Sequence, residues 1–243
     1  PEAAAACVSD IIGHGIIPVA IEFMDKLAIE ICEAFAHAGY PLDAGALLIV
    51  EVEGSDAEME TQLKKIVDIA RRHDVKTVRE SQSAMEAARI WKGRKSAFGA
   101  TGRVADYICM DGTVPTSKLC HVLDETYRIV EHYGLRVANV FHAGDGNMHP
   151  LILFNANKPG DLEKAEAFGA DILRLCVEVG GCLTGEHGVG IEKRDLMGVQ
   201  YDPDDLAIQM QVKDLFDPQW LLNPAKVFPL AASQPFRDRA AAE

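Results

Sequence analysis

The sequence lacks the features that mark several common protein classes. No apolar run among its 243 residues reaches the roughly 18 residues that a membrane-spanning helix needs. Positive charge is scarce, since 24 Lys and Arg residues stand against 37 Asp and Glu residues, for a formal net charge of −13. Nucleic acids and anionic membranes bind basic surfaces, so neither is an expected partner.

Paired cysteine motifs and a leader are also absent. None of the six cysteines forms a C-x-x-C pair and most lie in apolar runs, which predicts reduced, buried thiols rather than a zinc or iron–sulfur set. We therefore expect a cytoplasmic protein. The chain starts with neither Met nor a basic segment and has no cleavage site near its start, which indicates no signal peptide and a start within a longer protein.

The pattern of apolar residues predicts an α+β fold. Helices are expected at 2–15, 26–41, 55–75, 84–98, 116–134, 160–181 and 202–218, and strands at 16–25, 45–54, 76–81, 106–115 and on both sides of a turn near 145. No strand is followed by G-x-G-x-x-G, so an open antiparallel sheet with helices packed on one face fits better than a dinucleotide-binding fold. We expect one domain over residues 1–230 and a frayed tail over 231–243.

The segment FHAGDGNMH, residues 141–149, places two histidines around a turn. Asp-Gly between apolar runs favours a two-residue hairpin with Asp145 and Gly146 at its tip. In that register His142 lies directly opposite His149, about 5 Å apart on one face, close enough for both imidazoles to bind one metal ion. A histidine pair without a ligand remains the alternative.

Two further segments carry candidate chemistry. In GEHGVG, residues 185–190, Glu186 could add an oxygen ligand and His187 could accept a proton beside the metal, or both could lie in a solvated loop. In RIWKGRKSAF, Arg94 and Lys95 could bind a substrate carboxylate, or they could form a solvated helix face with Trp91 in the core.

Three motifs in order carry a family resemblance: VFHAGDGNMHPLILFN, GGCLTGEHGVGIEKRDLM and FDPQWLLNPAKVFP. Together they resemble the C-terminal half of FAD-linked 2-hydroxyacid oxidases, the family of the D-type subunit of glycolate oxidase, D-lactate dehydrogenase and D-2-hydroxyglutarate dehydrogenase. The segment RIWKGRKSAFGATGRVADYICMDGTVP is most similar to the glycolate oxidase branch. The resemblance implies the cap, or substrate, domain of a flavoprotein of the vanillyl-alcohol oxidase type. The N-terminal domain that holds FAD would precede this chain and is absent from it.

The resemblance also implies roles for particular residues. His142, His149 and Glu186 correspond to ligands of a divalent metal, usually zinc, and His187 to the base that takes the substrate hydroxyl proton. Arg94, with Lys95 beside it, corresponds to the residue that binds the substrate carboxylate. Asn223 falls in the NP-x-K tail that runs toward the flavin.

The resemblance further narrows the substrate. Cys109 and Leu151 stand where relatives specific for 2-hydroxyglutarate carry a lysine and an asparagine, which favours a small monocarboxylate such as glycolate or D-lactate, since a second carboxylate would be buried without a partner.

The implied partners are the chain's own FAD domain and flavin and iron–sulfur subunits of a glycolate oxidase complex, at the inner face of the membrane. The chain alone is expected to be inactive. A self-sufficient His/His/Glu metal hydrolase and a non-catalytic assembly domain remain alternative functions.

Overall fold

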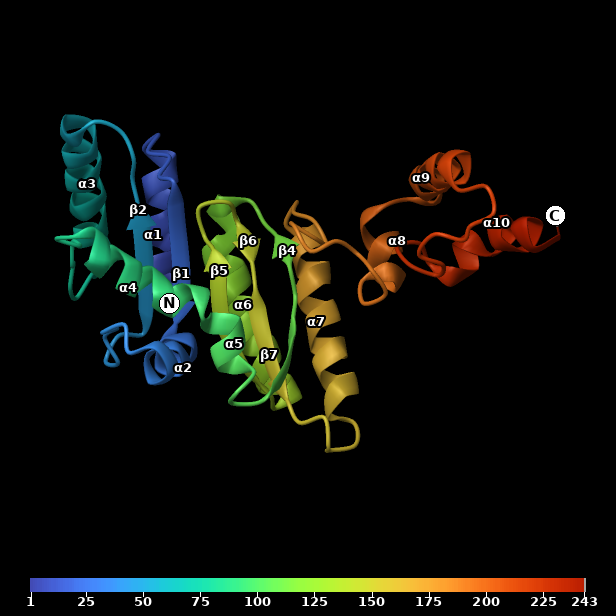
Figure 1. The fold of residues 1–243 in the computed structure, drawn as a ribbon, viewed down its shortest axis with the longest axis horizontal. Helices are drawn as coiled ribbons and strands as arrows, with labels where there is room; N and C mark the ends of the chain where they lie inside the picture. Colours follow the sequence, from blue (N-terminus) through green and yellow to red (C-terminus); the bar gives the residue numbers. More distant parts are fainter. Residues whose placement is uncertain (243) are drawn as a thin grey trace.

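A computed structural model describes residues 1–242 of the chain and shows a sheet flanked by helices, with a C-terminal arm set to one side (Figure 1). The strands are β1 (Ala20–Asp25), β2 (Ala46–Glu51), β3 (Asp106–Cys109), β4 (Gly112–Thr113), β5 (Arg136–His142), β6 (Asn147–Met148) and β7 (Pro150–Phe154). The helices are α1 (Glu2–Gly13), α2 (Lys26–Ala36), α3 (Asp56–Ala70), α4 (Ala84–Lys95), α5 (Ala97–Thr101), α6 (Leu119–Tyr133), α7 (Asp161–Glu178), α8 (Met197–Gln200), α9 (Pro203–Phe216) and α10 (Leu230–Ala242).

Strand β5 lies at the centre of the sheet. Near its end it pairs with β1, which in turn pairs with β2, and near its start it pairs with β7, which pairs with β3. The last residue of β5 pairs with β6, and β6 pairs with β4. Every pairing is antiparallel, so the expected α+β fold with an open antiparallel sheet is confirmed.

Helices cover both faces of the sheet, and the expectation of a single covered face is wrong. Phe23 of β1 stacks on Phe141 of β5 with ring centroids 4.6 Å apart, in a core that α1, α3, α6 and α7 share. Met24, which follows Phe23, and Val140, which precedes Phe141, pair with each other and lie in a second core with residues of α2 and α5. Successive side chains of a strand point to opposite faces, so apolar residues at consecutive positions require a cover on each side.

Two segments differ from expectation. Residues 76–81 form no strand, because Arg79 ties this stretch to Glu86 of α4 and to the carbonyl oxygen of Gly39. The tail expected to fray forms α10, and Phe236 of this helix stacks on Trp220 with ring centroids 5.3 Å apart. This ring contact packs the part of α10 around Phe236 against Trp220.

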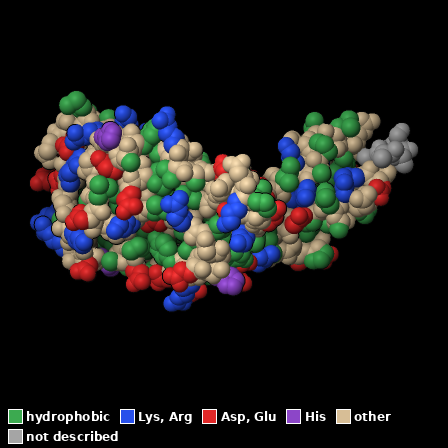
Figure 2. Space-filling model, turned by 90° about the horizontal axis from the view of Figure 1, so that it is seen from below, with side chains coloured by type: hydrophobic (Ala, Val, Ile, Leu, Met, Phe, Trp, Pro, Cys, Tyr) green, Lys and Arg blue, Asp and Glu red, His purple; other side chains and the backbone are tan. Residues whose placement is uncertain are grey.

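No helix in residues 1–242 is both long and apolar enough to cross a membrane. The six cysteines all lie in this range and are free; Cys7, Cys32 and Cys176 are buried, but Cys182 is exposed. The space-filling view in Figure 2 shows a mixed surface of acidic, basic and apolar side chains, with a notch between the main body and the C-terminal arm.

Candidate functional site

The turn between β5 and β6 is longer than expected. His142 pairs with Asn147, so four residues, 143–146, separate the strands, and the predicted pairing of His142 with His149 is wrong by two positions. The wider loop is held by neighbouring strands, because Gly144 N donates to the carbonyl oxygen of Ile21 and Gly146 O accepts from Val114 N. A shift of two positions leaves each side chain on its original face, so the two imidazoles still lie near each other.

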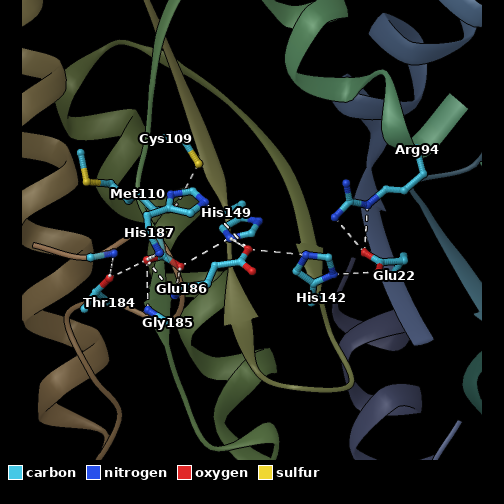
Figure 3. A network of polar contacts seen from close by, with 12 residues as sticks. Glu22, Arg94, Cys109, Met110, His142, His149, Thr184, Gly185, Glu186 and His187 are labelled. Carbon is cyan, nitrogen blue, oxygen red and sulfur yellow. Dashed lines mark hydrogen bonds and ion pairs between the residues drawn. The ribbon is translucent and has the colours of Figure 1, made fainter. Parts of the chain in front are cut away.

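Four predicted residues meet around one carboxylate oxygen. Glu186 Oε1 lies 3.2 Å from His149 Nε2 and 3.8 Å from the Nε2 atom of both His142 and His187. The rings of His142 and His149 stand edge to face at 5.3 Å, and those of His149 and His187 stack at 4.9 Å. In Figure 3 Glu186 reaches from its loop into the space between His142 and His149. The sheet and the Gly-rich loop at 185–190 therefore converge here.

His149 is the most enclosed of these groups. It is 1% exposed, and neither ring nitrogen has a hydrogen-bond partner among the described residues. Burial, with the nearby imidazoles of His187 and His142, lowers the pKa of His149 to about 4. The ring is therefore neutral at physiological pH and keeps a free lone pair, as a metal ligand requires.

His142 is oriented by a buried ion pair. Its Nδ1 donates to Glu22 Oε1 at 2.7 Å, and Glu22 Oε2 accepts from Arg94 Nε at 2.9 Å. Glu22 and Arg94 are 4% and 5% exposed, and Glu22 pairs directly with His142 across β1 and β5. The hydrogen bond to Glu22 raises the pKa of His142 and leaves its Nε2 free on the side of Glu186. A carboxylate behind an imidazole is the usual support of a metal-binding histidine.

Asp111 lies between β3 and β4 and supports the loop that carries Glu186 and His187. It is fully buried, and its carboxylate accepts from the Thr184 hydroxyl, from the amides of residues 185–187 and from Lys193 Nζ. Burial alone would raise the pKa of Asp111, but these donors, first among them the Thr184 hydroxyl, hold it well below the usual 3.8. The group is therefore a carboxylate at neutral pH.

The donor set fits a divalent cation. Imidazole nitrogens and a carboxylate oxygen suit zinc, and Nε2 of buried His149, which has no hydrogen-bond partner, lies 3.2 Å from Glu186 Oε1 and 3.5 Å from Asp111 Oδ1. Ligand atoms of Asp111, His149, Glu186 and His187 lie within 4.8 Å of one another, a group that leaves out His142 and includes Asp111. Five donor groups converge on Asp111 Oδ2, while Oδ1 accepts only from the Glu186 amide and lies 3.5 Å from His149 Nε2. Nε2 of His142 has no hydrogen-bond partner among the described residues and lies 3.8 Å from Glu186 Oε1.

Two predicted residues lie apart from this cluster. Lys95, at the last position of α4, is exposed, and its ammonium lies 5.7 Å from the centre of the Trp91 ring. Asn223 lies between α9 and α10 with φ +46° and accepts from Lys226 Nζ at 3.3 Å. No contact in the described part of the chain joins either residue to the histidines.

Sequence reasoning missed Glu22, Asp111, Thr184 and Lys193. One signal could have identified Glu22, because it is an acid with apolar residues on both sides in the strand AIEFMD. Asp111 precedes a glycine and resembles a turn residue, and Lys193 resembles a solvated charge. The partners of Asp111 in the loop are 76 positions away at the His187 amide and 82 at Lys193, so only the fold reveals them.

Two solved enzyme structures share this fold. The chain is similar to p-cresol methylhydroxylase with substrate bound, with a TM-score of 0.64 and 14% identity over 93% of this chain and 51% of that one. It is also similar to the 4-ethylphenol oxidase of Gulosibacter chungangensis, with a TM-score of 0.55 and 14% identity over 86% and 47% of the two chains. The chain thus has the fold of about half of each of these two enzymes.

The sequence match is more specific. Residues 1–227 match the family of FAD linked oxidases, C-terminal domain, and the chain belongs to this family, which implies FAD as the cofactor. Glycolate oxidase subunit GlcD of Escherichia coli strain K12 is 50% identical over 94% of this chain, and that of Bacillus subtilis is 34% identical over 93%. A D-lactate dehydrogenase of Archaeoglobus fulgidus is 30% identical over 93%. The chain spans about half the length of the curated relatives it matches, 46% to 49% for these three.

Proposed function

We propose that this chain is the substrate- and metal-binding half of an FAD-dependent enzyme that oxidises a small 2-hydroxy acid to the 2-oxo acid. The observation that carries the proposal is the meeting of three imidazole Nε2 atoms at one Glu186 oxygen, within 3.2 to 3.8 Å. Family membership supports the flavin chemistry and favours neither the hydrolase nor the assembly alternative.

His142, His149 and Glu186 are the proposed ligands of a divalent cation, zinc by their chemistry. His142 is chosen over Asp111 because Glu22 fixes its Nδ1 and its Nε2 faces Glu186, whereas the Asp111 carboxylate is tied through Oδ2 to five donor groups of the 184–193 segment. A cation held there would polarise the substrate hydroxyl and carboxylate oxygens and lower the pKa of the hydroxyl group.

His187 is the proposed base. It is 40% exposed, so a substrate can reach it, and its ring is held against His149 by stacking at 4.9 Å. It would take the hydroxyl proton while the Cα hydrogen leaves as hydride, so that the alcohol carbon becomes a carbonyl. FAD, when bound, supplies the acceptor for the two electrons.

Arg94 is the proposed partner of the substrate carboxylate. Glu22 holds it at Nε and Nη2, which leaves the rest of its five N–H donors for a second anion. Lys95 stays a weaker candidate, since it is exposed over Trp91. Cys109 pairs directly with Leu151 across β3 and β7, so two uncharged side chains occupy these neighbouring positions, which favours glycolate or D-lactate over a diacid.

The proposed principal partner is an FAD-binding domain in the same protein. The C-terminal arm carries large apolar side chains that are mostly exposed, among them Phe216 at 80% and Leu221 at 70%, which a monomeric domain seldom leaves uncovered. Asn223 lies two residues after Leu221, so its proposed place near the flavin is consistent with a domain docked on this arm. Further flavin and iron–sulfur subunits, and a cytoplasmic location at the inner face of the membrane, belong to the same proposal.

Elemental analysis of the purified chain tests the metal site. We expect about one zinc per wild-type chain at neutral pH and a loss of metal in His149→Ala, because this ligand is buried and no neighbour replaces it. His132→Ala is the matched control, since His132 lies on α6 away from the cluster. Wild-type protein that stays free of metal after dialysis against zinc would contradict the ligand assignment.

Turnover tests the reaction. With the FAD domain present, the protein should reduce an artificial electron acceptor with glycolate or D-lactate, and His187→Gln should lower kcat by about 100-fold or more through loss of the base. Equal rates with 2-hydroxyglutarate would contradict the proposed substrate class.

A further inference from the structure

Asp111 binds a row of backbone amides from a distant loop. The amides of Gly185, Glu186 and His187 donate to its carboxylate at 2.9 to 3.1 Å, and the Thr184 hydroxyl donates at 2.7 Å. Gly188 N donates in turn to the Thr184 hydroxyl at 2.9 Å, which closes the loop. Three successive amides around one anion form a nest, an arrangement that binds negative charge strongly.

Lys193 completes the cluster. It is 2% exposed, and its Nζ lies 3.1 Å from Asp111 Oδ2 and 3.4 Å from the Asp111 carbonyl oxygen. A buried ammonium requires a charge partner, and Asp111 supplies it. Lys193 therefore fixes the far end of the same Gly-rich segment that begins at Thr184.

The cluster holds Glu186 and His187 by their backbone, since their side chains are only partly packed. Their side chains are 54% and 40% exposed and project from the loop toward the histidines (Figure 3). The loop also approaches β6 closely, because a Cβ atom at position 185 would lie 2.6 Å from the Asn147 amide oxygen. The direction of both side chains thus depends on the hydrogen bonds that the amides of residues 185–187 donate to Asp111.

We propose that Asp111 and Lys193 are positioning residues that fix the 184–188 loop so that Glu186 and His187 face His142 and His149. The inference deepens the proposed function, on which it rests for the identity of the site. Asp111 is assigned to the loop rather than to the metal because all five donor groups converge on its Oδ2. Its Oδ1 accepts only from the Glu186 amide and lies 3.5 Å from His149 Nε2, so the test must separate positioning from ligation.

The test measures the zinc dissociation constant of the full-length protein by competition with a chromophoric chelator. Asp111→Asn keeps the shape but turns an amide group toward the loop amides, and should weaken zinc binding by about 10- to 100-fold, the usual effect of a lost supporting group. Thr184→Val removes one donor near the surface and should weaken binding by several-fold. Thr126→Val, a buried threonine on α6 that bonds only within its helix, should leave binding unchanged.

A double variant separates positioning from charge pairing. Asp111→Asn with Lys193→Met leaves no unpaired buried charge, so it should regain much of the unfolding midpoint lost in Asp111→Asn while zinc binding stays weak. Recovery of zinc binding in the double variant would overturn the proposal, because charge neutralisation would then be the whole role of Asp111. Complete loss of zinc in Asp111→Asn, equal to that in His149→Ala, together with unchanged binding in Thr184→Val, would make Asp111 a ligand and would also overturn it.

Hydrogen exchange keeps the two proposals distinguishable. If the wild-type protein binds no zinc, the proposed metal function fails, but the positioning role still predicts faster exchange of the amides of residues 185–187 in Asp111→Asn and Thr184→Val. Unchanged exchange at these amides would overturn the positioning role, whether or not zinc binds.

Discussion

Replacing Glu22 by Gln is the sharpest test of the buried ion pair beneath the site. Glu22 and Arg94 side chains are 5% and 7% exposed, with Oε2 and Nη2 2.8 Å apart, so the change leaves a buried guanidinium without its counter-charge. Breaking a buried pair in this way costs about 3–5 kcal/mol of unfolding free energy, and we expect the lower end, about 3 kcal/mol, because Gln keeps one acceptor oxygen.

A double-mutant cycle measures the pair itself. Arg94→Met should cost a similar amount, and the combined variant should cost less than the sum by about 2–3 kcal/mol, since no charge is then left alone. The assay is equilibrium urea unfolding at pH 7 followed by circular dichroism, with unchanged slopes as the criterion for comparing midpoints.

The matched control is an ion pair of the same type on the surface. Arg128 and Glu125 of α6 are 73% and 29% exposed, so neutralising either should cost less than about 1 kcal/mol. Single variants at Glu22 and Arg94 that cost no more than this control, and that simply add, would refute the reasoning. Arg94 could then bind a substrate carboxylate without Glu22 as its ion-pair partner.

Three further predictions concern other parts of the fold. Asp25→Asn should lower the unfolding free energy by about 2–4 kcal/mol, because the Asp25 carboxylate caps α2 and accepts from Asn139 and Tyr127 in the core; urea unfolding measures it. Gly146→Ala should cost more than Gly134→Ala, as judged by melting temperature: both have positive φ, but a Cβ atom at 146 would strike the backbone of Val114, while the space at 134 is open. The Lys213 ammonium, with the amides of residues 222 and 221, lowers the pKa of Asp217 from 3.8, so the ionised carboxylate stabilises the fold above pH 3.8 and this stabilisation is lost as the pH falls further. Trp220 fluorescence should therefore change on acidification, and Asp217→Asn should remove that change. An identical acid transition in the variant would refute the assignment.

The local structure could be predicted from the sequence because helix caps and strand patterns depend on residues that are close together in the chain. The capping box at the start of α3 is an example, since Ser55 and Glu58 satisfy each other within one turn. The strands around the two histidines were predicted for the same reason, although the turn between them is longer. The error was harmless, because the side-chain period of a strand is two and the register moved by two.

The turn length could not be predicted, because it depends on partners outside the turn. The Asp-Gly pair favours a two-residue turn by itself, but Gly144 and Gly146 are hydrogen-bonded to Ile21 and Val114 of other segments. The number of covered faces is a different case, because the strands themselves carry the signal. Apolar residues at consecutive positions, such as Phe23 and Met24, require a cover on each side of the sheet.

The sequence by itself determined which residues could form the site and which family the chain belongs to. The four residues belong to short sequence motifs, which can be recognised without knowing the tertiary structure: His142, His149, Glu186 and His187. Only the tertiary structure decided what holds them. Glu22 reaches His142 across 120 positions, and Asp111 reaches the His187 amide across 76, because strand pairing and loop docking bring together charges that could not be buried alone.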